Sequence, residues 1–327
     1  MYYFSKTASE EWSAGFYSAK PLLLPASVVK KIMHIDFSQI STMEKQQWLQ
    51  HAIAPRPVCF ASTIDLAGNV NVSPFSFFNL FSSNPPIVIF APSRRVRDNT
   101  TKHTLQNVWE VPECVINMVD YNMVQQTSLS SCEFAKGVDE FVKSGFTKEP
   151  ATMVKPPMVK EAKIKLECKV NEIKSLGEEG GAGQLVIAEV LCMHVDESIL
   201  GKDGKIDQRK LHLVARLGGD WYCKVDETNL FTVNKPNTQI AIGVDVLPEG
   251  IRHSLILTGN HLGLLGNVHD IPEINPAFTN DRLKSIIQYY SISPIEMEKE
   301  LHIYAAELLN IGKVQDAWQV LLSGENI

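Results

Sequence analysis

A run of aromatic side chains with interspersed hydroxyl and amide groups is the first segment whose composition suggests chemistry. Residues 73–86 read SPFSFFNLFSSNPP, in which Ser76, Asn79 and Ser82 lie among four phenylalanines. Apolar walls with a few polar groups are typical of a pocket for a flat heteroaromatic ring. A strand end with ordinary aromatic packing explains the same residues, so both interpretations stay open.

The next segment carries the densest group of positive charge in the chain. Residues 91–104 read APSRRVRDNTTKHT and combine guanidinium, hydroxyl and amide donors between an apolar run and an expected helix. Arginine binds a phosphate dianion through two hydrogen bonds at once, and a helix N-terminus adds oriented N–H groups. The two segments together predict a ring pocket and a phosphate anchor, whereas a solvated loop with a threonine cap is the alternative for the second.

The elements that must position these residues are short and β-prone. Residues 58–64 and 70–73 are separated by turn residues and predict a hairpin, and the unbroken apolar run 87–91 predicts a strand buried on both faces. Further strands are expected at 114–119, 162–172 and 184–195, and a helix at 101–109. The glycine-rich stretch 177–183 permits a sharp reversal between the last two strands. Many short strands at this spacing favour a closed or nearly closed barrel.

The two ends of the chain differ in texture from this middle part. Residues 1–50 form a lead-in with an apolar run at Leu22–Pro25, and Ser41 or Thr42 followed by Glu44 predicts a short helix that ends before Pro55. Residues 226–327 form a C-terminal extension, in which residues 281–322 predict two amphipathic helices. Five apolar positions recur there at helical spacing: Met297, Leu301, Tyr304, Leu308 and Leu309.

Composition excludes several classes of protein. The fractions of hydrophobic residues (44%) and charged residues (21%) indicate a globular chain with a packed core. A formal charge of −6 with one arginine cluster does not fit a nucleic-acid partner. Six well-separated cysteines without a zinc-ligand pattern suggest reduced core thiols and no metal. Neither a leader nor a run of membrane-spanning length is present, so we expect a cytoplasmic protein without a membrane partner.

At this point the sequence resembles the flavin reductase-like FMN-binding split-barrel family, which includes flavoredoxin-type proteins and reductase components of two-component monooxygenases. The resemblance covers about residues 50–224, with the barrel placed at 51–225, and the aromatic segment with its Asn-Pro-Pro is its most specific part. The matching segments are 55–58 (PRPV), 62–63 (ST), 71–79 (NVSPFSFFN), 84–86 (NPP), 104–107 (TLQN), 137–141 (GVDEF), 155–157 (KPP) and 215–219 (ARLGG).

The resemblance implies a mainly β protein, a six-stranded antiparallel Greek-key barrel with helical additions. It also implies FMN at a homodimer edge and hydride transfer from NADH or NADPH through the flavin. By position in the family pattern, Ser62 and Thr63 approach the isoalloxazine, and the ring and ribityl chain are lined by Ser76, Phe77, Phe78 and Asn79. The residues that the resemblance implies for binding the phosphate are Ser93, Arg94, Arg97, Thr101 and Thr104. Many members read Lys-Asp-Thr where this chain reads Lys102-His103-Thr104 after a longer arginine loop, so the arginine that touches phosphate stays open.

His194 stands in the strand where some family members place a histidine on the nicotinamide side, although a single histidine that ends an apolar strand also fits a structural role. His212 is a weaker candidate for the same role. The segment 128–141 resembles a family loop that closes over the cofactor, and an ordinary surface connection explains it equally.

Three functions remain open at the level of sequence. The resemblance favours an NAD(P)H-dependent flavin reductase, with a flavin, another protein, a quinone or a metal complex as electron acceptor. The alternatives are an FMN-binding or electron-transfer protein without turnover, and a flavin-free barrel that serves as a dimerisation scaffold. The C-terminal extension is expected to cover the flavin edge, extend the dimer interface or dock a partner.

Overall fold

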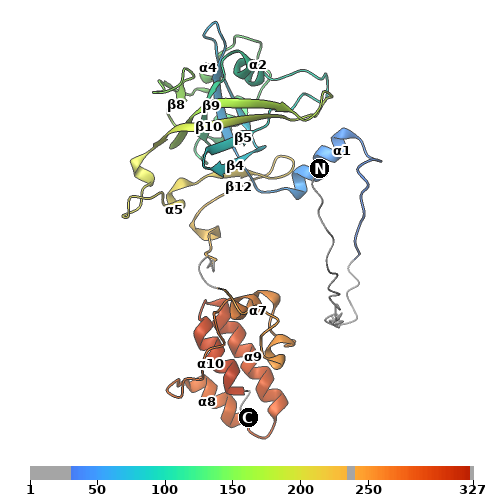
Figure 1. The fold of residues 1–327 in the computed structure, drawn as a ribbon, viewed down its shortest axis with the longest axis vertical. Helices are drawn as coiled ribbons and strands as arrows, with labels where there is room; N and C mark the ends of the chain where they lie inside the picture. Colours follow the sequence, from blue (N-terminus) through green and yellow to red (C-terminus); the bar gives the residue numbers. More distant parts are fainter. Residues whose placement is uncertain (1–30, 234–239, 325–327) are drawn as a thin grey trace, which may run out of the picture. The chain divides into compact units, whose positions relative to one another are not determined.

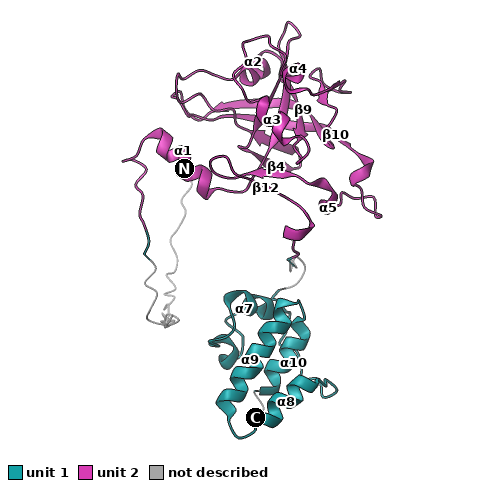
Figure 2. Cartoon of the chain, turned by 180° about the vertical axis from the view of Figure 1, so that it is seen from behind, with its two compact units in different colours: residues 1–32, 233–327 teal, residues 33–232 magenta. Residues whose placement is uncertain are grey.

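The computed structural model describes residues 31–233 and 240–324, which divide into two compact units (Figures 1 and 2). One unit, here called the barrel unit, spans residues 33–232. The other, here called the helical unit, holds the described residues 31–32, 233 and 240–324. The apolar run predicted at Leu22–Pro25 lies outside the described residues.

The barrel unit is built on one large antiparallel sheet. Its strands are β2 (Cys59–Ile64), β3 (Val70–Phe75), β4 (Phe78–Ser83), β5 (Pro86–Phe90), β6 (Glu113–Met118), β9 (Ile164–Ser175) and β10 (Gln184–Val195). They pair in the order β3-β2-β6-β9-β10-β5-β4, which confirms the mainly β class. The sheet has seven strands where six were predicted, because residues 78–83 pair with β5 as an edge strand (Figure 1).

Two small sheets complete the β structure. Strands β1 (Arg56–Pro57), β11 (Val214–Arg216) and β12 (Tyr222–Lys224) form the first, with β11 in the centre, and β7 (Lys148–Glu149) pairs with β8 (Met158–Val159) in the second. In the first of these sheets Arg56 lies opposite Arg216. Two cationic residues from distant parts of the sequence are therefore neighbours.

Strand β2 is buried on both faces although it carries Ser62 and Thr63. In β5, for which burial of both faces was predicted, Val88 and Phe90 are buried but Ile87 and Ile89 are only half-buried. Cys59 and Ala61 enter one core cluster together with Leu105 of α2 (His103–Glu110), whereas Phe60 enters a second cluster together with Phe141 of α4 (Glu140–Ser144). Because successive side chains of a strand point to opposite faces, the alternation along β2 feeds two cores at once. The sheet therefore holds helices on both of its faces.

The helices of the barrel unit are short. They are α1 (Thr42–Ala52), α2 (His103–Glu110), α3 (Val124–Leu129), α4 (Glu140–Ser144) and α5 (Gln208–Leu211), with 3-10 turns η1 (Glu197–Ile199) and η2 (Glu227–Asn229). Helix α1 begins with the predicted cap, since Ser41 and Glu44 form a reciprocal capping box. A buried network joins α2 and α4 through β3: Asn71 donates to Glu140 Oε1 at 2.7 Å and accepts from Thr104 Oγ1 at 2.6 Å.

The helical unit comprises α6 (Glu249–Arg252), α7 (Gly259–Gly266), α8 (Asp281–Tyr289), α9 (Pro294–Asn310) and α10 (Val314–Gly324). The five predicted stripe positions on α9 are all buried, around the fully buried Trp318 of α10. Three helices fill the range where two were predicted, because Pro294 begins α9 separately from α8. Gly312, with φ of 75°, forms the turn between α9 and α10.

Two global features bear on the sequence predictions. Every helix in the described part of the chain is too short or too polar to cross a membrane. All six cysteines are free, and Cys59, Cys114 and Cys168 are buried in the sheet core.

Candidate functional site

A cavity of about 650 Å³ lies between helix α1, the loop after β5 and the start of α2. Leu49, Ile53 and Phe77 give it an apolar wall. Six cationic side chains line it, namely Lys45, Arg56, Arg94, Arg95, Arg97 and Lys102, against a single carboxylate, that of Glu133. We call it the cationic cavity. Its size is that of a small-molecule site, and its charge suits an anion.

Arg56 fixes helix α1 against the sheet and so forms one side of the cationic cavity. Its guanidinium donates to the carbonyls of Gln50 at 2.6 Å, of Ile53, and of Leu217 at 2.9 Å. A cation at the last turn of a helix is favoured by the helix dipole. Burial, and then the neighbouring charge of Arg216, lower the pKa of Arg56, and no carboxylate among the described residues pairs with it.

The docking of α1 also explains a glycine of the ARLGG segment. A Cβ on Gly218 would lie 2.3 Å from the ring of His51, far closer than real carbon atoms approach. Only glycine therefore lets the last turn of α1 rest on the connection between β11 and β12.

The arginine loop, residues 91–102, is held in shape by its own side chains. Arg94 donates from Nε to Asn99 Oδ1 at 2.6 Å and from Nη2 to the Asn99 carbonyl at 3.0 Å. Asn99 has φ of 56°, a left-handed conformation that asparagine tolerates better than most residues. The donors of Arg94 that face the loop are thus occupied, and its role in the structure is to shape the loop.

The glycine-rich turn between β9 and β10 supports the arginine loop from outside. The backbone N–H of Arg94 donates to Ala182 at 2.9 Å, and that of Gly181 donates back to Arg94 at 2.9 Å. A Cβ on Gly180 would lie 3.0 Å from the carbonyl oxygens of Arg95 and Val96. The predicted reversal therefore also positions the cationic residues.

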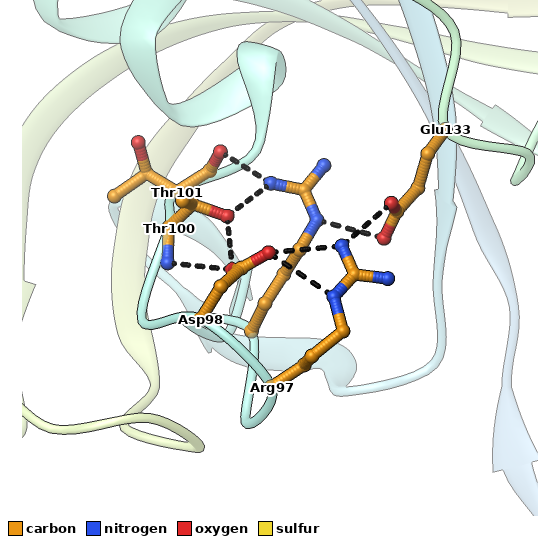
Figure 3. Close-up of polar contacts among 6 residues, drawn as sticks. Arg97, Asp98, Thr100, Thr101 and Glu133 are labelled. Carbon is orange, nitrogen blue, oxygen red and sulfur yellow. Dashed lines mark hydrogen bonds and ion pairs between the residues drawn. The ribbon is translucent and has the colours of Figure 1, made fainter.

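Glu133 is the one carboxylate of the cavity, and it pairs with two of the arginines (Figure 3). Its Oε1 lies 3.0 Å from Arg95 Nε and its Oε2 lies 2.9 Å from Arg97 Nη2. The hydrogen bond from Arg97 lowers the pKa of Glu133, so the carboxylate is charged at neutral pH. Both partners of the Arg97 pair are exposed, and such surface pairs contribute less than about 1 kcal/mol each. An incoming anion can therefore replace this carboxylate at little cost.

Lys102 differs from the arginines of the cavity because its ammonium has neither an ion-pair partner nor a hydrogen-bond acceptor among the described residues. Among the described residues no carboxylate lies within ion-pair distance of its Nζ, which sits 5.2 Å from the centre of the Phe75 ring. Burial lowers the pKa of Lys102, and the charge of Arg95 lowers it further. Desolvation and a like charge both disfavour the ammonium, so a bound anion would stabilise it.

Lys102 also lines a second cavity of about 190 Å³, which we call the Ser76 cavity. Phe75, Ser76 and Val58 form part of its wall, and Thr127 and Ser128 of α3 close it. This space combines apolar surface with hydroxyl groups, as the sequence predicted for a ring pocket. The shared lysine joins the two cavities.

The structure brings five of the predicted site residues to these cavities. Ser76 lines the Ser76 cavity, and Phe77, Ser93, Arg94 and Arg97 line the cationic cavity. Three others line neither cavity: Phe78 packs on the sheet core, Asn79 is exposed on β4, and Thr101 accepts from Gln106 at 3.1 Å. Their contacts with a cofactor stay predictions.

Ser62, Thr63 and Thr104 are fully buried and line neither cavity. Ser62 donates to the Pro157 carbonyl at 2.5 Å, and Thr63 accepts from Asn107 at 3.1 Å. Thr104 donates to Asn71. In this structure their hydroxyls join secondary elements to one another, and their predicted contacts with the cofactor stay predictions.

His194 lies on β10, beside a buried carboxylate. Its Nε2 is 2.6 Å from Oε1 of Glu167, whose side chain is fully buried. Burial raises the pKa of Glu167, but hydrogen bonds led by those from Thr152 outweigh that effect and lower it to about 2. Cys192 also lies within 4.8 Å, yet both Glu167 oxygens are already taken by Thr152, Met153, Val154 and His194. The geometry gives His194 a structural partner, and its role on the nicotinamide side stays a prediction.

Sequence reasoning did not single out Lys102, Lys45, Arg56 or Glu133 as site residues. Lys102 was noted only where the chain departs from Lys-Asp-Thr, and Arg56 only within a matching segment. A cation that immediately precedes a helix, after a run of phosphate-binding residue types, was a usable signal for Lys102. Nothing in the sequence places Glu133 opposite Arg95, since 38 positions separate them.

Comparison with known proteins adds two findings. Residues 51–211 match the sequence model described as the flavin reductase like domain. An uncharacterized protein of Aquifex aeolicus is 36% identical over 172 residues, which are 53% of this chain and 85% of that protein. An uncharacterized protein of Halalkalibacterium halodurans is 34% identical over 206 residues, or 62% of this chain and 97% of that protein.

Solved structures resemble the same part of the chain. Nitrilotriacetate monooxygenase component B from Bacillus cereus aligns with a TM-score of 0.58 at 28% identity, over 62% of this chain and 99% of that one. The 2-nitrobenzoate 2-nitroreductase of Pseudomonas fluorescens aligns with a TM-score of 0.57 at 25% identity, over 64% and 100%. A protein of Shewanella frigidimarina described as a flavin reductase with a split barrel domain aligns with a TM-score of 0.54 at 26% identity, over 62% of this chain and 100% of that one.

Proposed function

Because the chain belongs to the flavin reductase-like family, we propose that it is an FMN-binding oxidoreductase that takes electrons from NADH or NADPH. The acceptor is a free flavin or another electron acceptor, including a protein. The observation that carries the proposal is the cationic cavity, in which six cations face one carboxylate beside the aromatic wall of Phe77.

The residues present fit FMN in two respects. Lys102 offers an ammonium without an ion-pair partner, Arg95 pairs with Glu133, and Arg97 pairs with Glu133 and Asp98 through exposed contacts, so the three suit a phosphate dianion. Phe77 lines the cationic cavity and Ser76 lines the Ser76 cavity, and Lys102 lines both. The phenyl ring of Phe77 suits the flat flavin ring, and the hydroxyl of Ser76 suits its polar edge. We assign the phosphate to the cationic cavity and the ring to the Ser76 cavity and its border.

When bound, FMN would supply a two-electron centre that takes hydride from a reduced nicotinamide and delivers the electrons to an acceptor. The protein's part is then to bind, orient and exclude water. Leu49, Ile53 and Phe77 supply apolar cover, and Lys102 and the arginines supply fixed positive charge. No acid–base pair is needed from the protein.

Titration of the purified protein with FMN tests the proposal. We expect quenching of flavin fluorescence and a bound-flavin absorption spectrum that bleaches on anaerobic addition of NADH or NADPH. If neither nucleotide bleaches the bound FMN, the protein is an electron-transfer or carrier protein. If FMN does not bind, the remaining function is that of a flavin-free dimerisation scaffold. Either outcome would refute the reductase.

We also propose that the protein is a homodimer, paired through the β4 edge. Strand β4 ends the main sheet, and Leu80 and Phe81 on it are 61% and 64% exposed. An exposed apolar edge strand is a site for association with another chain. The cytoplasmic location and the role of residues 226–327 stay predictions.

Replacing Phe81 by glutamate is expected to convert the dimer into monomers, because it places a charge in the apolar contact. Light scattering after gel filtration measures the mass in solution. The matched control is Leu66→Glu, since Leu66 is 78% exposed in the turn between β2 and β3 and should leave the dimer intact. A wild-type protein that is monomeric at micromolar concentration would contradict the dimer.

A further inference from the structure

The helical unit contains a cavity of about 370 Å³, which we call the helical cavity. It lies between α6, the first half of α9 and the end of α10, in the part of the chain that follows the matched family domain of residues 51–211. The buried core residues Ile251, Leu301 and Leu321 give it an apolar wall, and Ile295, which is 80% exposed, also lines it. A cavity of this volume is at the small end of ligand sites, so it suits one residue-sized group with an apolar side chain.

His302 supplies the helical cavity with a hydrogen-bond donor. It lines the cavity although it is only 7% exposed, and its Nδ1 lies 2.7 Å from Ser254 Oγ. That oxygen accepts from the backbone N–H groups of Ile256 and Leu257, both at 3.1 Å, so its two lone pairs are used and its hydrogen is donated to Nδ1. The imidazole is therefore neutral with its proton on Nε2, for which the described residues offer no acceptor.

Glu298 supplies the same cavity with a negative charge. It precedes His302 by one turn on the same face of α9, and its charge partly offsets the burial that lowers the pKa of His302. A Cβ on Gly250 would lie 3.0 Å from Glu298 Oε1, so the carboxylate lies against α6 at a position where glycine leaves room for it. Lys299 pairs with Glu296 instead, and none of the cationic nitrogens that the structure describes lies within 4.0 Å of the Glu298 carboxylate. This charge is therefore available to a cation.

We infer that the helical cavity binds an apolar residue at the amino terminus of a peptide. The side chain of that residue packs on the apolar wall, its ammonium group pairs with Glu298, and its carbonyl oxygen accepts from His302 Nε2. Because the cavity has room for about one residue, the cation, the acceptor and the apolar group belong to the same residue.

The charge of the helical unit favours a peptide over a free amino acid. The described residues 240–324 include ten Asp and Glu against five Lys and Arg. A free amino acid brings its own carboxylate next to Glu298, and like charges in contact oppose binding. In a peptide the first carbonyl is neutral, so only the ammonium charge enters the cavity.

Binding of L-leucinamide to the full-length protein tests the site, because this probe carries the ammonium, the carbonyl and an apolar side chain without a negative charge. Titration by saturation-transfer NMR measures the affinity. N-acetyl-L-leucinamide lacks the charge and should bind about fivefold more weakly. Isoamylamine, which keeps the ammonium and the side chain but lacks the carbonyl, should also bind about fivefold more weakly.

Glu298→Gln assigns the charge effect to one residue. The variant should bind L-leucinamide about fivefold more weakly than wild type and N-acetyl-L-leucinamide within about twofold of wild type. Glu300→Gln is the matched control, since it makes the same change on α9 at a residue that does not line the cavity. Both variants should bind FMN as wild type does, because the cationic cavity belongs to the barrel unit.

The outcomes separate this inference from the proposed function. Absence of L-leucinamide binding, or equal losses in Glu298→Gln and Glu300→Gln, would overturn the inference and leave FMN binding untouched. The amide of Leu-Gly-Gly should bind more tightly than free L-leucine. Tighter binding of L-leucine would assign the cavity to a free amino acid and would also overturn the inference.

Discussion

Replacing Lys102 by methionine is expected to weaken FMN binding by about 10- to 100-fold, because hydrogen bonds to charged groups contribute about 1.5–3 kcal/mol and each 1.4 kcal/mol is tenfold. Methionine keeps an unbranched apolar chain beside Phe75, so the fold should be preserved. Lys102 shares with Arg56 a pKa lowered by burial and the lack of a carboxylate partner among the described residues. Arg56 donates to three backbone carbonyls, whereas Lys102 Nζ has no hydrogen-bond acceptor in the described part of the chain.

Riboflavin, which lacks the phosphate, makes the test specific. If Lys102 binds the phosphate, the affinity for riboflavin should change by less than about twofold in Lys102→Met while that for FMN falls. Fluorescence quenching titrations of both flavins at low and high salt give the comparison, and the salt dependence of FMN binding should also decrease in the variant.

Glu133→Gln is expected to change the affinity for FMN in the opposite direction, at the same site. Removing the carboxylate takes away the ion-pair partner of Arg95 and leaves Arg97 paired with Asp98 alone, and we expect FMN to bind up to about fivefold more tightly, the scale of a surface ion pair. Lys174→Met, at an exposed position of β9, is the neutralisation control for Lys102→Met. Equal losses of FMN and riboflavin affinity in Lys102→Met would place the phosphate elsewhere.

Glu167→Gln is expected to destabilise the barrel unit by about 3 kcal/mol at neutral pH. The Glu167 pKa of about 2, against an ordinary value of 4.5, corresponds to that free energy at 1.36 kcal/mol per pKa unit. The carboxylate accepts from the backbone N–H groups of Thr152, Met153 and Val154, and an amide nitrogen cannot accept from them. The segment 152–154 should therefore detach from β9.

The pH dependence follows from the sign of the same effect. Because the folded pKa of Glu167 lies below its unfolded value, its contribution is present above about pH 4.5 and is lost as the pH falls through about 2. The difference in unfolding free energy between wild type and Glu167→Gln should accordingly shrink as the pH is lowered from about 5 toward 3.

Urea unfolding at several pH values, followed by amide hydrogen exchange of residues 152–154, measures this effect. The matched control is Glu172→Gln, an exposed carboxylate on the same strand, for which little change is expected at any pH. A Glu167→Gln protein with unchanged protection of the segment would contradict the account. His194→Gln provides a further comparison, since loss of bleaching by NADH with intact stability would favour the predicted nicotinamide-side role over the structural one.

Much of the fold followed from local patterns in the sequence. Short β-prone runs separated by turn residues predicted the hairpin of β2 and β3 and the long β10, and Ser41 or Thr42 followed by Glu44 predicted α1. The sequence did not predict strand β4. Its consecutive residues Leu80 and Phe81 are both exposed at the sheet edge, so apolar and polar residues do not alternate there as they do in a strand with one buried face. The very short strands β1, β11 and β12 have too few residues for any periodicity.

The site was predicted in its composition and only partly in its membership. Residue types sufficed to place a ring pocket near Ser76 and Phe77 and an anion site at the arginine loop, because guanidinium groups and helix N-termini bind phosphate wherever they occur. Ser62, Thr63 and Thr104 share the same residue types, yet the structure buries their hydroxyls in contacts between strands and helices.

Only the tertiary structure decided which charges are balanced. The sequence by itself determined that Arg94, Arg95, Arg97 and Lys102 lie close together. It did not determine that Asn99 accepts hydrogen bonds from Arg94, or that Glu133 forms ion pairs with Arg95 and Arg97. The energy of a buried or half-buried charge depends on its neighbours in space, and those neighbours come from distant parts of the chain. Lys102 therefore stands out as the open anchor of the site only after the chain has folded.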